Sequence, residues 1–543
     1  MHRQKRILIV DDLQEWREEL VETLERNGFH ADSAASASEA LTKLHSTIYH
    51  IVVLDIRMDE MNPNNDGSKM DGIALLRELN MQGLSEVTKV IMLSAYGTAE
   101  LMRQTFRDYK IVDFLSKDEF NNKEFLELVR KVFAQDVKLN QELEIHWQDG
   151  TRLDDFVVNL EIGGKRIQHS DDRQGLIAAE LDDLLCRLFF RAESILVSPL
   201  TPGFSGAGVL RVQPFFRAGG GGHEVIVKFG DSQKIEQEHS HFKEYVQPFL
   251  GGGRTTTIVD VRYTFRLGGI IYSLVGAAHD PVVDFADFYR ARDISQIIKA
   301  LDGLFRHTCG NWYASRGNLR LLNLSAEYEQ WSHFSVERLE QVIAEQLKSV
   351  EGKQALRFKN LKSDRDFTNP LHAIARQTLV RPTYSCTTHG DCNVHNLLVD
   401  TTGHIWLIDF QGTGQSHILR DVATLDAVIR FQLLGTDEAS LEERLHMEET
   451  LDSIKHFSEV KQLPNAFSTQ NVALAKVYAT VVHLRTIARN LVAQNPADDI
   501  NEYYIALLYA ALNTLRFPSV PQGQREHALL SASLLADRIG LHA

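Results

Sequence analysis

The strongest constraint on the fold is an alternation of short apolar runs with helical patterns across the first 134 residues. The runs are mostly β-branched or aliphatic: Ile7–Val10, Ile51–Leu54, Val90–Leu93 and Val112–Leu115. Strands that are apolar on both faces are typical of parallel sheets covered by helices. The segments between them carry apolar residues at helical spacing. This rhythm predicts a doubly wound α/β sheet, with its functional residues at the carboxyl ends of the strands.

Carboxylates follow two of these strands. Asp11 and Asp12 come directly after the first run, and Asp55 follows Leu54. The ends of such strands lie side by side, so we expect the three carboxylates to converge. Like charges so close together require a cation, and an oxygen-rich site suits Mg²⁺.

Two further polar side chains follow later strands. Ser94 ends the run VIMLS, and Lys117 ends VDFLSK. A hydroxyl and an ammonium in the same crevice are the partners that a phosphoryl group on Asp55 requires. An Asp-Asp pair alone is usually a solvated turn or a helix cap, and a lone serine after a strand is more often a cap. The ordered set favours a phosphorylation site instead.

These residues resemble the response-regulator receiver family over residues 4–134. The resemblance implies that Asp55 is the phosphoacceptor, that Asp12 binds Mg²⁺ directly and that Asp11 acts mainly through metal-bound water. It implies further roles for the carbonyl of Arg57 as a metal ligand, for Ser94 and Phe114 as switch residues, and for Lys117 as the phosphate partner. The implied partner protein is a cognate histidine kinase.

Two departures from the receiver family lie in loops. The segment MDEMNPNNDGSKMDG, residues 58–72, is longer than the usual turn, and Asp118 stands where proline is common. Neither removes a phosphorylation group. Both are expected to alter the docking of partners.

A second set of polar residues lies in HGDCNVHNLLVDTTGHIWLIDF, residues 389–410. Asp391 and Asn396 fall on a predicted loop, and Asp409 follows the apolar strand Ile405–Ile408. Phosphoryl transfer requires metal ligands for the nucleotide phosphates and a carboxylate that orients the attacking hydroxyl. Candidate phosphate-binding residues lie upstream: Gly203, Gly206 and Gly208 on a predicted hairpin, and Lys228 at the end of the strand EVIVK. Glu238 on the next helix is the candidate that holds Lys228 in place, with Glu236 and Glu244 as less favoured alternatives.

Together these residues resemble the protein-kinase-like superfamily, in its aminoglycoside/choline phosphotransferase-like branch. The resemblance runs weakly over residues 195–520 and is sharp only at residues 389–421. It implies ATP and Mg²⁺ as cofactors, with these roles: Asp391 as catalytic base or hydroxyl-orienting group, Asn396 and Asp409 as Mg²⁺ ligands, Lys228 on the α/β-phosphates, Glu238 paired with Lys228, and Asp421 as a structural brace of the catalytic loop. The whole chain also resembles bacterial proteins in which a receiver is fused to a "ternary complex associated" phosphotransferase-like domain.

The departures from protein kinases bear on the substrate. The loop reads HGD instead of HRD, and Gln411 stands between Phe410 and Gly412. Only a short segment separates Asp409 from Asp421, which leaves little room for a segment that docks peptides. A small-molecule hydroxyl or amine is therefore the expected acceptor. Taken alone, the glycines are consistent with a simple hairpin turn, and Lys228 with a strand lysine whose stem is buried.

The pattern along the chain predicts four parts. Residues 1–134 form the receiver, 135–194 a helical or mixed connector, 195–280 a strand-rich N-lobe and 281–543 a helical C-lobe. Strands followed by helices indicate an α+β unit of two lobes. The expected architecture is thus a doubly wound five-stranded receiver joined to a two-lobed kinase-like domain.

Composition excludes several classes of protein. The net charge of −15 argues against nucleic acid or an anionic membrane as the main partner. No apolar run approaches the roughly 20 residues of a membrane helix. The four cysteines form no CxxC pair, which is typical of reduced thiols, and we expect a cytoplasmic protein. No helix-turn-helix pattern ends the chain, which disfavours a DNA-binding transcription factor.

The leading hypothesis is a bacterial two-component signalling protein. Phosphorylation of Asp55 is expected to change a surface near Ser94 and Phe114, and so to alter docking or homodimerisation and the activity of an ATP-dependent phosphotransferase. Two alternatives stay open: a pseudokinase scaffold that binds ATP or a partner without turnover, and a protein kinase or nucleotidyl transferase. The sequence does not identify the acceptor substrate or the sign of the regulation.

Overall fold

The computed structural model describes most of the chain, in two compact units. The described residues are 3–56, 71–81, 87–95, 106–148, 150, 152–169, 171–200, 206–217, 219–249, 255–275, 282–332, 336–344, 355–358, 360–362, 365–375 and 377–541. Unit 1 comprises Met1–Glu236 with Ile258–Ser273, and unit 2 comprises Gln237–Thr257 with Leu274–Ala543. The division differs from the predicted boundaries at 134 and 280, because the receiver and most of the strand-rich region share one unit.

A five-stranded parallel sheet forms the N-terminal part of unit 1. Its order is β2-β1-β3-β4-β5, with bounds β1 Arg6–Val10, β2 His30–Ala34, β3 Ile51–Leu54, β4 Lys89–Ser94 and β5 Asp113–Ser116. The core residues of β1 and β3 are almost fully buried, as their unbroken apolar sequence predicts. The predicted doubly wound sheet is confirmed.

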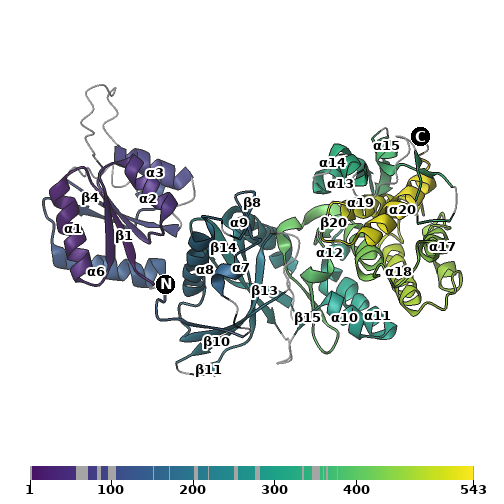
Figure 1. Ribbon diagram of the computed structural model, residues 1–543, viewed down its shortest axis with the longest axis horizontal. Coiled ribbons are helices and arrows are strands. Elements are labelled where there is room, and N and C mark those ends of the chain that lie inside the picture. The colour runs from purple at the N-terminus through teal and green to yellow at the C-terminus, as the bar shows by residue number, and fades with distance from the viewer. Residues whose placement is uncertain are drawn as a thin grey trace. The chain divides into compact units, whose positions relative to one another are not determined.

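Helices cover both faces of this sheet (Figure 1). α1 (Gln14–Arg26) and α6 (Asn122–Val132) pack on one face, and α2 (Ala37–Ser46) and α3 (Asp71–Met81) pack on the other. The two resulting cores contain no shared residue, since alternate residues of each strand point to opposite faces. This arrangement leaves the carboxyl ends of the strands open for functional side chains.

A second, mixed sheet occupies the rest of unit 1. Its order is β13-β14-β12-β10-β9-β6, with β11 paired to β10. The strand bounds are β6 Glu144–Trp147, β9 Ser194–Pro199, β10 Gly208–Phe216, β11 Gly220–Gly221, β12 Val225–Asp231, β13 Thr255–Tyr263 and β14 Leu267–Val275. The smaller elements are α7 Leu153–Phe156, β7 Glu161–Ile162 and β8 Lys165–Arg166.

The predicted connector is part of this sheet and not a separate element. β6 pairs in parallel with β9 at the sheet edge. α8 (Gln174–Leu188) buries its apolar side, including Leu181 and Leu184, in one core with β9, β10 and β12. An apolar helix face needs such a cover, and the sheet supplies it.

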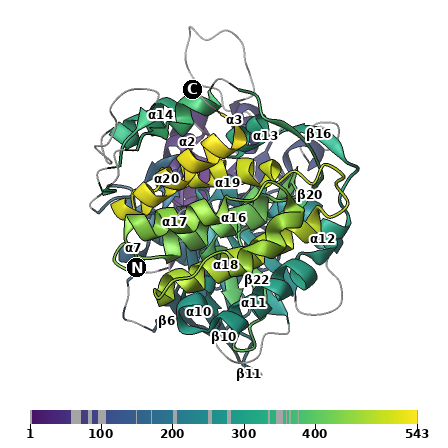
Figure 2. The ribbon, with the colours of Figure 1, turned by 90° about the vertical axis from the view of Figure 1, so that its right-hand side faces the viewer.

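Unit 2 is mainly helical. Its helices are α10 Phe285–Ala291, α11 Ile294–Gly303, α12 Gly310–Ala314, α13 Leu324–Ser332, α14 Val336–Val342, α15 Pro370–Ile374, α16 Arg420–Val428, α17 Leu441–Leu451, α18 Val472–Leu491, α19 Asn501–Thr514 and α20 Gln522–Ile539. α9 (Ser232–His241) crosses from unit 1 into unit 2. Figure 2 shows α16 to α20 packed together, with α19 almost fully buried between its neighbours.

Short strand pairs frame the loops of unit 2. They are β15 (Val283–Asp284), β21 (Leu397–Val399) and β22 (Ile405–Leu407) in one sheet, and the pairs β16 (Arg320–Asn323) with β19 (Val380–Thr383), β17 (Ala355–Leu356) with β18 (Phe367–Thr368), and β20 (Ser385–Thr388) with β23 (Gly414–His417). Among the described helices, none is long and apolar enough to cross a membrane.

Candidate functional site

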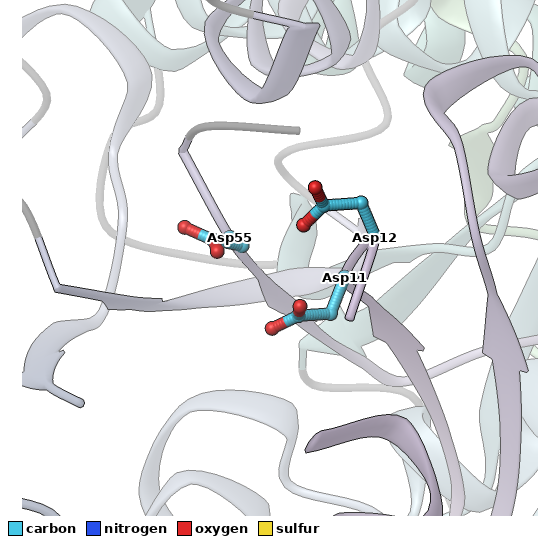
Figure 3. Close-up of side chains that lie close together, drawn as sticks. All are labelled: Asp11, Asp12 and Asp55. Carbon is cyan, nitrogen blue, oxygen red and sulfur yellow. The ribbon is translucent and has the colours of Figure 1, made fainter. Parts of the chain in front are cut away.

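Three carboxylates meet at the carboxyl edge of the receiver sheet (Figure 3). Asp11 and Asp12 follow β1 and Asp55 follows β3, and one oxygen of each lies within 4.8 Å of the others. The register fixes this meeting, because the Asp55 N–H donates to the carbonyl of Val10 at 2.9 Å. A cluster of carboxylate oxygens is the donor set that Mg²⁺ prefers, so these residues fit the predicted metal.

Lys117 joins the cluster from the end of β5. Its Nζ lies 2.6 Å from Asp11 Oδ2 and 2.6 Å from Asp55 Oδ2. Burial alone would lower the pKa of Lys117, but the hydrogen bonds to the two carboxylates outweigh it and raise the pKa. Burial raises the pKa of Asp11 in spite of the ammonium. Lys117 is therefore charged and in hydrogen-bond reach of the predicted phosphoacceptor.

The predicted switch residues lie on β4 and β5. Ser94 is buried at the end of β4, and its carbonyl accepts a hydrogen bond from the Lys117 N–H at 3.1 Å. Phe114, half-buried, pairs with Met92 across the two strands. The predicted carbonyl ligand Arg57, together with most of the loop 58–72, lies outside the described residues.

Two residues of α1 contribute to this site without having been predicted. The Arg17 guanidinium donates to the carbonyl of Asp11 at 2.7 Å and to that of Asp12 at 2.8 Å, and thereby holds the turn that carries the carboxylates. The Trp16 ring centroid lies 5.3 Å from Lys117 Nζ. The sequence signal that could have identified Trp16 and Arg17 is their position in the first turn of the helix that follows the Asp-Asp pair.

The second site, in unit 2, is built on the loop after β20. The Asn396 amide donates to the carbonyl of Asp391 at 2.9 Å and to its Oδ2 at 3.1 Å. The Asn393 amide, which sequence reasoning missed, donates to the same Oδ2 at 3.0 Å. His395 Nδ1 lies 3.0 Å from Asp284 Oδ2, a contact that ties the loop to the N-cap of α10. The structure thus brings Asp391 and Asn396 together.

Asp421 anchors this loop from the start of α16. Its two oxygens accept the backbone N–H groups of His389 at 2.8 Å and Gly390 at 2.9 Å. The Tyr313 hydroxyl adds a third donor at 3.1 Å. A carboxylate that satisfies two buried N–H groups fixes the backbone directly before Asp391.

Gly390 is required by the geometry of the loop. Its φ is +85°, and a Cβ built there would lie 1.9 Å from the carbonyl oxygen of Gly412. The close approach joins the Asp391 loop to the segment after Asp409, and Arg420 donates to the Gly390 carbonyl at 2.8 Å. The glycine of HGD, where protein kinases carry arginine, therefore has a steric cause.

Glu238 holds the backbone of Phe410, the residue that follows Asp409. The Phe410 N–H donates to Glu238 Oε1 at 3.1 Å. Glu238 is buried whereas the alternatives Glu236 and Glu244 are exposed. Asp409 is buried and holds a φ of +69°, a costly conformation for a residue with a side chain.

Charge and burial act together on Asp391. Burial, and then the charge of Asp409, raises the pKa of Asp391, while the Asn393 hydrogen bond opposes this rise. A carboxylate with a raised pKa accepts a proton more readily near neutral pH. The two aspartates are therefore close enough in unit 2 to share an electrostatic environment.

The predicted upstream residues belong mostly to unit 1. Lys228 is buried in β12, opposite Ile270 of β14, so its pairing with Glu238 stays a prediction. Gly206 and Gly208 have packing reasons, since a Cβ would lie 2.6 Å from Glu161 Cβ at Gly206 and 2.3 Å from the Phe229 ring at Gly208. Gly203 lies outside the described residues.

Two family models match this chain, one over its N-terminal part and one over most of the remainder. The family model for the response regulator receiver domain matches residues 7–130. The model for ternary complex associated domain 9 matches residues 192–353 and 336–516, more than half of the chain. The chain belongs to the ternary complex associated domain 9 family. Its N-terminal part is a response regulator receiver domain, and the expected resemblance to the receiver family is confirmed.

Two curated regulatory proteins are similar to part of this chain. The C4-dicarboxylate transport transcriptional regulatory protein DctD of Rhizobium meliloti (strain 1021) is 32% identical over 111 residues, which are 20% of this chain and 22% of DctD. The regulatory protein AtoC of Escherichia coli (strain K12) is 32% identical over 166 residues, 29% of this chain and 32% of AtoC. The chain thus spans less than two thirds of the length of either relative.

Solved structures match a quarter of the chain. NtrX from Brucella abortus in complex with ATP is 26% identical, with 25% of this chain and 28% of NtrX covered and a TM-score of 0.22. A response regulator receiver domain protein from Methanospirillum hungatei JF-1 is 25% identical, with 25% of this chain and 98% of that chain covered and a TM-score of 0.22.

Proposed function

We propose that this response regulator controls an ATP-dependent phosphotransferase site in unit 2 that acts on a small molecule. A cognate histidine kinase phosphorylates Asp55, and the phosphorylated receiver changes the activity of that site. The observation that carries the proposal is the joined loop of unit 2, in which Asn396 donates to Asp391 and Asp421 holds the preceding backbone.

The input chemistry rests on the receiver cluster. Asp55 is the acceptor, and Lys117, 2.6 Å from its carboxylate, takes one oxygen of the phosphoryl group. Asp11 and Asp12 hold Mg²⁺, which supplies the positive charge that offsets a dianionic phosphoryl group. The fit of these oxygen donors supports the assignment of Mg²⁺ as a cofactor.

The output chemistry rests on three side chains of unit 2. Asp391 orients the acceptor hydroxyl and takes its proton, for which a raised pKa is suited. Asn396 and Asp409 supply an amide and a carboxylate oxygen to Mg²⁺ on the nucleotide, which neutralises charge at the transferred phosphate. Glu238 fixes the backbone after Asp409 through the Phe410 N–H.

The short segment between Asp409 and Asp421 supports a small acceptor. Its residues 414–417 are used in β23, which pairs with β20 from Ser385 to Thr388. Gly412 is held against Gly390. The segment is therefore committed to internal contacts, and a platform for an extended peptide would have to come from elsewhere.

The test follows label from ATP in the full-length protein. With Mg²⁺, γ-labelled ATP and a panel of small amino alcohols and sugars, we expect label in the small-molecule fraction, and we expect Asp391→Asn to abolish its transfer. The exposed Asp366, paired with Arg357 in the same unit, gives the matched control Asp366→Asn, which keeps activity. Equal rates in Asp391→Asn and the parent would exclude the enzyme. ATP binding without transfer would identify a scaffold, and transfer of α-label a nucleotidyl transferase.

A further inference from the structure

The outward side of α8 carries charged residues that are nonetheless buried. Glu180 is fully buried, Arg187 is 4% exposed, and the side chain of Asp183 is 10% exposed. Buried charges are rare unless they are paired. The receiver, at the edge of its sheet opposite to Asp55, covers Asp183 and Arg187, and the turn between β13 and β14 covers Glu180. We call this edge the receiver base, and its residues are Arg3, His45, His50 and Val87.

The first contact of the receiver base is a chain of hydrogen bonds to the carboxylates of α8. Arg3 binds Asp182 with two hydrogen bonds, of 2.6 Å and 2.8 Å. His50 Nδ1 accepts the N–H of Arg6 at 3.0 Å, so its Nε2 carries the proton that it donates to Asp183 at 2.8 Å. The ring is thereby fixed in one tautomer and one orientation.

Arg187 completes this chain from α8. Its Nε donates to Asp183 at 2.6 Å and its Nη1 to the carbonyl of Val87 at 3.3 Å. Burial opposes the ionisation of Asp183, but Arg187 and His50 outweigh it and hold the pKa of Asp183 well below its usual range. Complementary buried charges of this kind permit one docking register and penalise others.

The second contact is the turn between β13 and β14. The Phe265 ring stacks on His45 at 5.3 Å and packs against the core of the receiver. Arg266 donates to the carbonyl of His45 and to Glu180. Thr264 also donates to Glu180, at 2.8 Å. The turn, α8 and the receiver base therefore meet at one place.

The strands of the receiver connect this place to the phosphorylation site. His50 directly precedes β3, and Asp55 directly follows it. Val87 lies shortly before β4, which ends at Ser94. β3 is thus followed by Asp55 and β4 ends at Ser94, and the residues that precede both strands contact α8.

The β13–β14 turn, which contacts the receiver base, continues directly into β14. Its first residue, Leu267, follows Arg266, and Ile270 pairs with Lys228 of β12. A cavity of about 340 Å³ lies beside the ion pairs and is lined by Arg3, His50 and Asp183 among others.

We propose that the receiver base, α8 and the β13–β14 turn form a fixed joint that transmits the phosphorylation state of Asp55 to β14. The joint couples phosphoryl binding at Asp55 to the conformation of β14. The factor by which a phosphoryl group shifts the conformational equilibrium of the joint therefore equals the factor by which the conformation of the joint changes the affinity of the Asp55 site for the phosphoryl mimic. This inference does not depend on ATP binding in unit 2.

Hydrogen exchange in the full-length protein tests the joint. Mg²⁺ with beryllium fluoride, a phosphoryl mimic, is added without nucleotide, and exchange is followed in peptides that cover residues 174–188 and 264–268. In the parent protein we expect rates in both peptides to change roughly fivefold or more, the lower end of typical allosteric coupling. Unchanged rates there, with a response confined to the receiver, would overturn the proposal.

Two variants and a control sharpen this test. In His50→Ala, and in Arg3→Ala whose pair is partly exposed, the response is expected to stay within the receiver. Arg26→Ala removes an exposed pair with Glu22 elsewhere on the receiver and should behave as the parent does. A full response in both joint variants would contradict the proposal. Should one variant fail to fold, the parent measurement still decides.

Discussion

Replacing Gly390 by alanine tests the contact that joins the two halves of the unit 2 site. Gly390 has a φ of +85°, and its new Cβ would lie 1.9 Å from the carbonyl oxygen of Gly412. Gly403 provides a matched control in the same unit, because its φ is +84° but its nearest neighbour would be at 3.8 Å. The two substitutions share the backbone cost and differ only in the clash.

The expected magnitudes follow from these two terms. A side chain in the left-handed region costs about 1–2 kcal/mol, and this is the whole cost for Gly403→Ala. Gly390→Ala adds about 1–3 kcal/mol of overpacking, because the obstacle is backbone that cannot rotate away. The Asp421 bond to the Gly390 N–H is also strained by any shift. We therefore expect Gly390→Ala to lose about 2–5 kcal/mol in all.

Urea unfolding followed by far-ultraviolet circular dichroism measures this difference, since unit 2 supplies most of the helix. A difference of at least about 1.5 kcal/mol between Gly390→Ala and Gly403→Ala supports the close approach of the two loops. Equal losses in the two variants would refute the reasoning, because they would show that Gly412 does not lie against Gly390.

Three further predictions concern charged groups. Asp421→Asn should cost about 2 kcal/mol in urea unfolding, because its amide leaves one buried N–H without an acceptor. Burial opposes the ionisation of Glu448, but Arg430 outweighs it and lowers the pKa of Glu448 to about 2 from 4.5. Glu448 thus contributes about 3 kcal/mol above pH 4.5, which is lost as the pH falls towards 2, and Glu448→Gln should flatten this acid limb. Lys117→Met should raise the affinity of the receiver for Mg²⁺ about tenfold, read by tryptophan fluorescence, because the ammonium competes for the same carboxylates.

A specific result would contradict each of these three predictions. An Asp421→Asn protein as stable as the parent would show that the two N–H bonds are not made. If the unfolding free energies of Glu448→Gln and the parent fall with pH at the same rate, the ion pair between Glu448 and Arg430 does not cause the loss of stability in acid. The exposed Lys123 of α6 is the control for Lys117, and Lys117→Met should bind Mg²⁺ more tightly than Lys123→Met. Equal Mg²⁺ affinities in these two variants would place Lys117 away from the metal site.

Local patterns were sufficient for the receiver. A buried parallel strand is visible as a continuous apolar run, and the doubly wound sheet then brings Asp11, Asp55 and Lys117 to one edge. In unit 2 the spacing of Asp391, Asn396 and Asp421 within one short segment made their meeting predictable. These are contacts between residues that a single turn or strand pair connects.

Long-range contacts could not be read in the same way. The sequence predicts α8 only as part of a connector, because it does not reveal that Asp183 meets His50, 133 residues away. The sequence likewise gives no sign that Glu161 and Phe229 are the neighbours that exclude a side chain at Gly206 and Gly208. In both cases the deciding partner lies in a distant element, and periodicity carries no information about it.

We propose above that unit 2 holds a nucleotide through Mg²⁺ at Asn396 and Asp409. Isothermal titration calorimetry of the full-length protein with ATP, with and without Mg²⁺, tests it most directly. We predict saturable binding that requires Mg²⁺ and that weakens at least roughly tenfold in Asp409→Asn, the loss of one charged ligand. No heat of binding in the parent protein, or equal affinity in Asp409→Asn, would contradict the account.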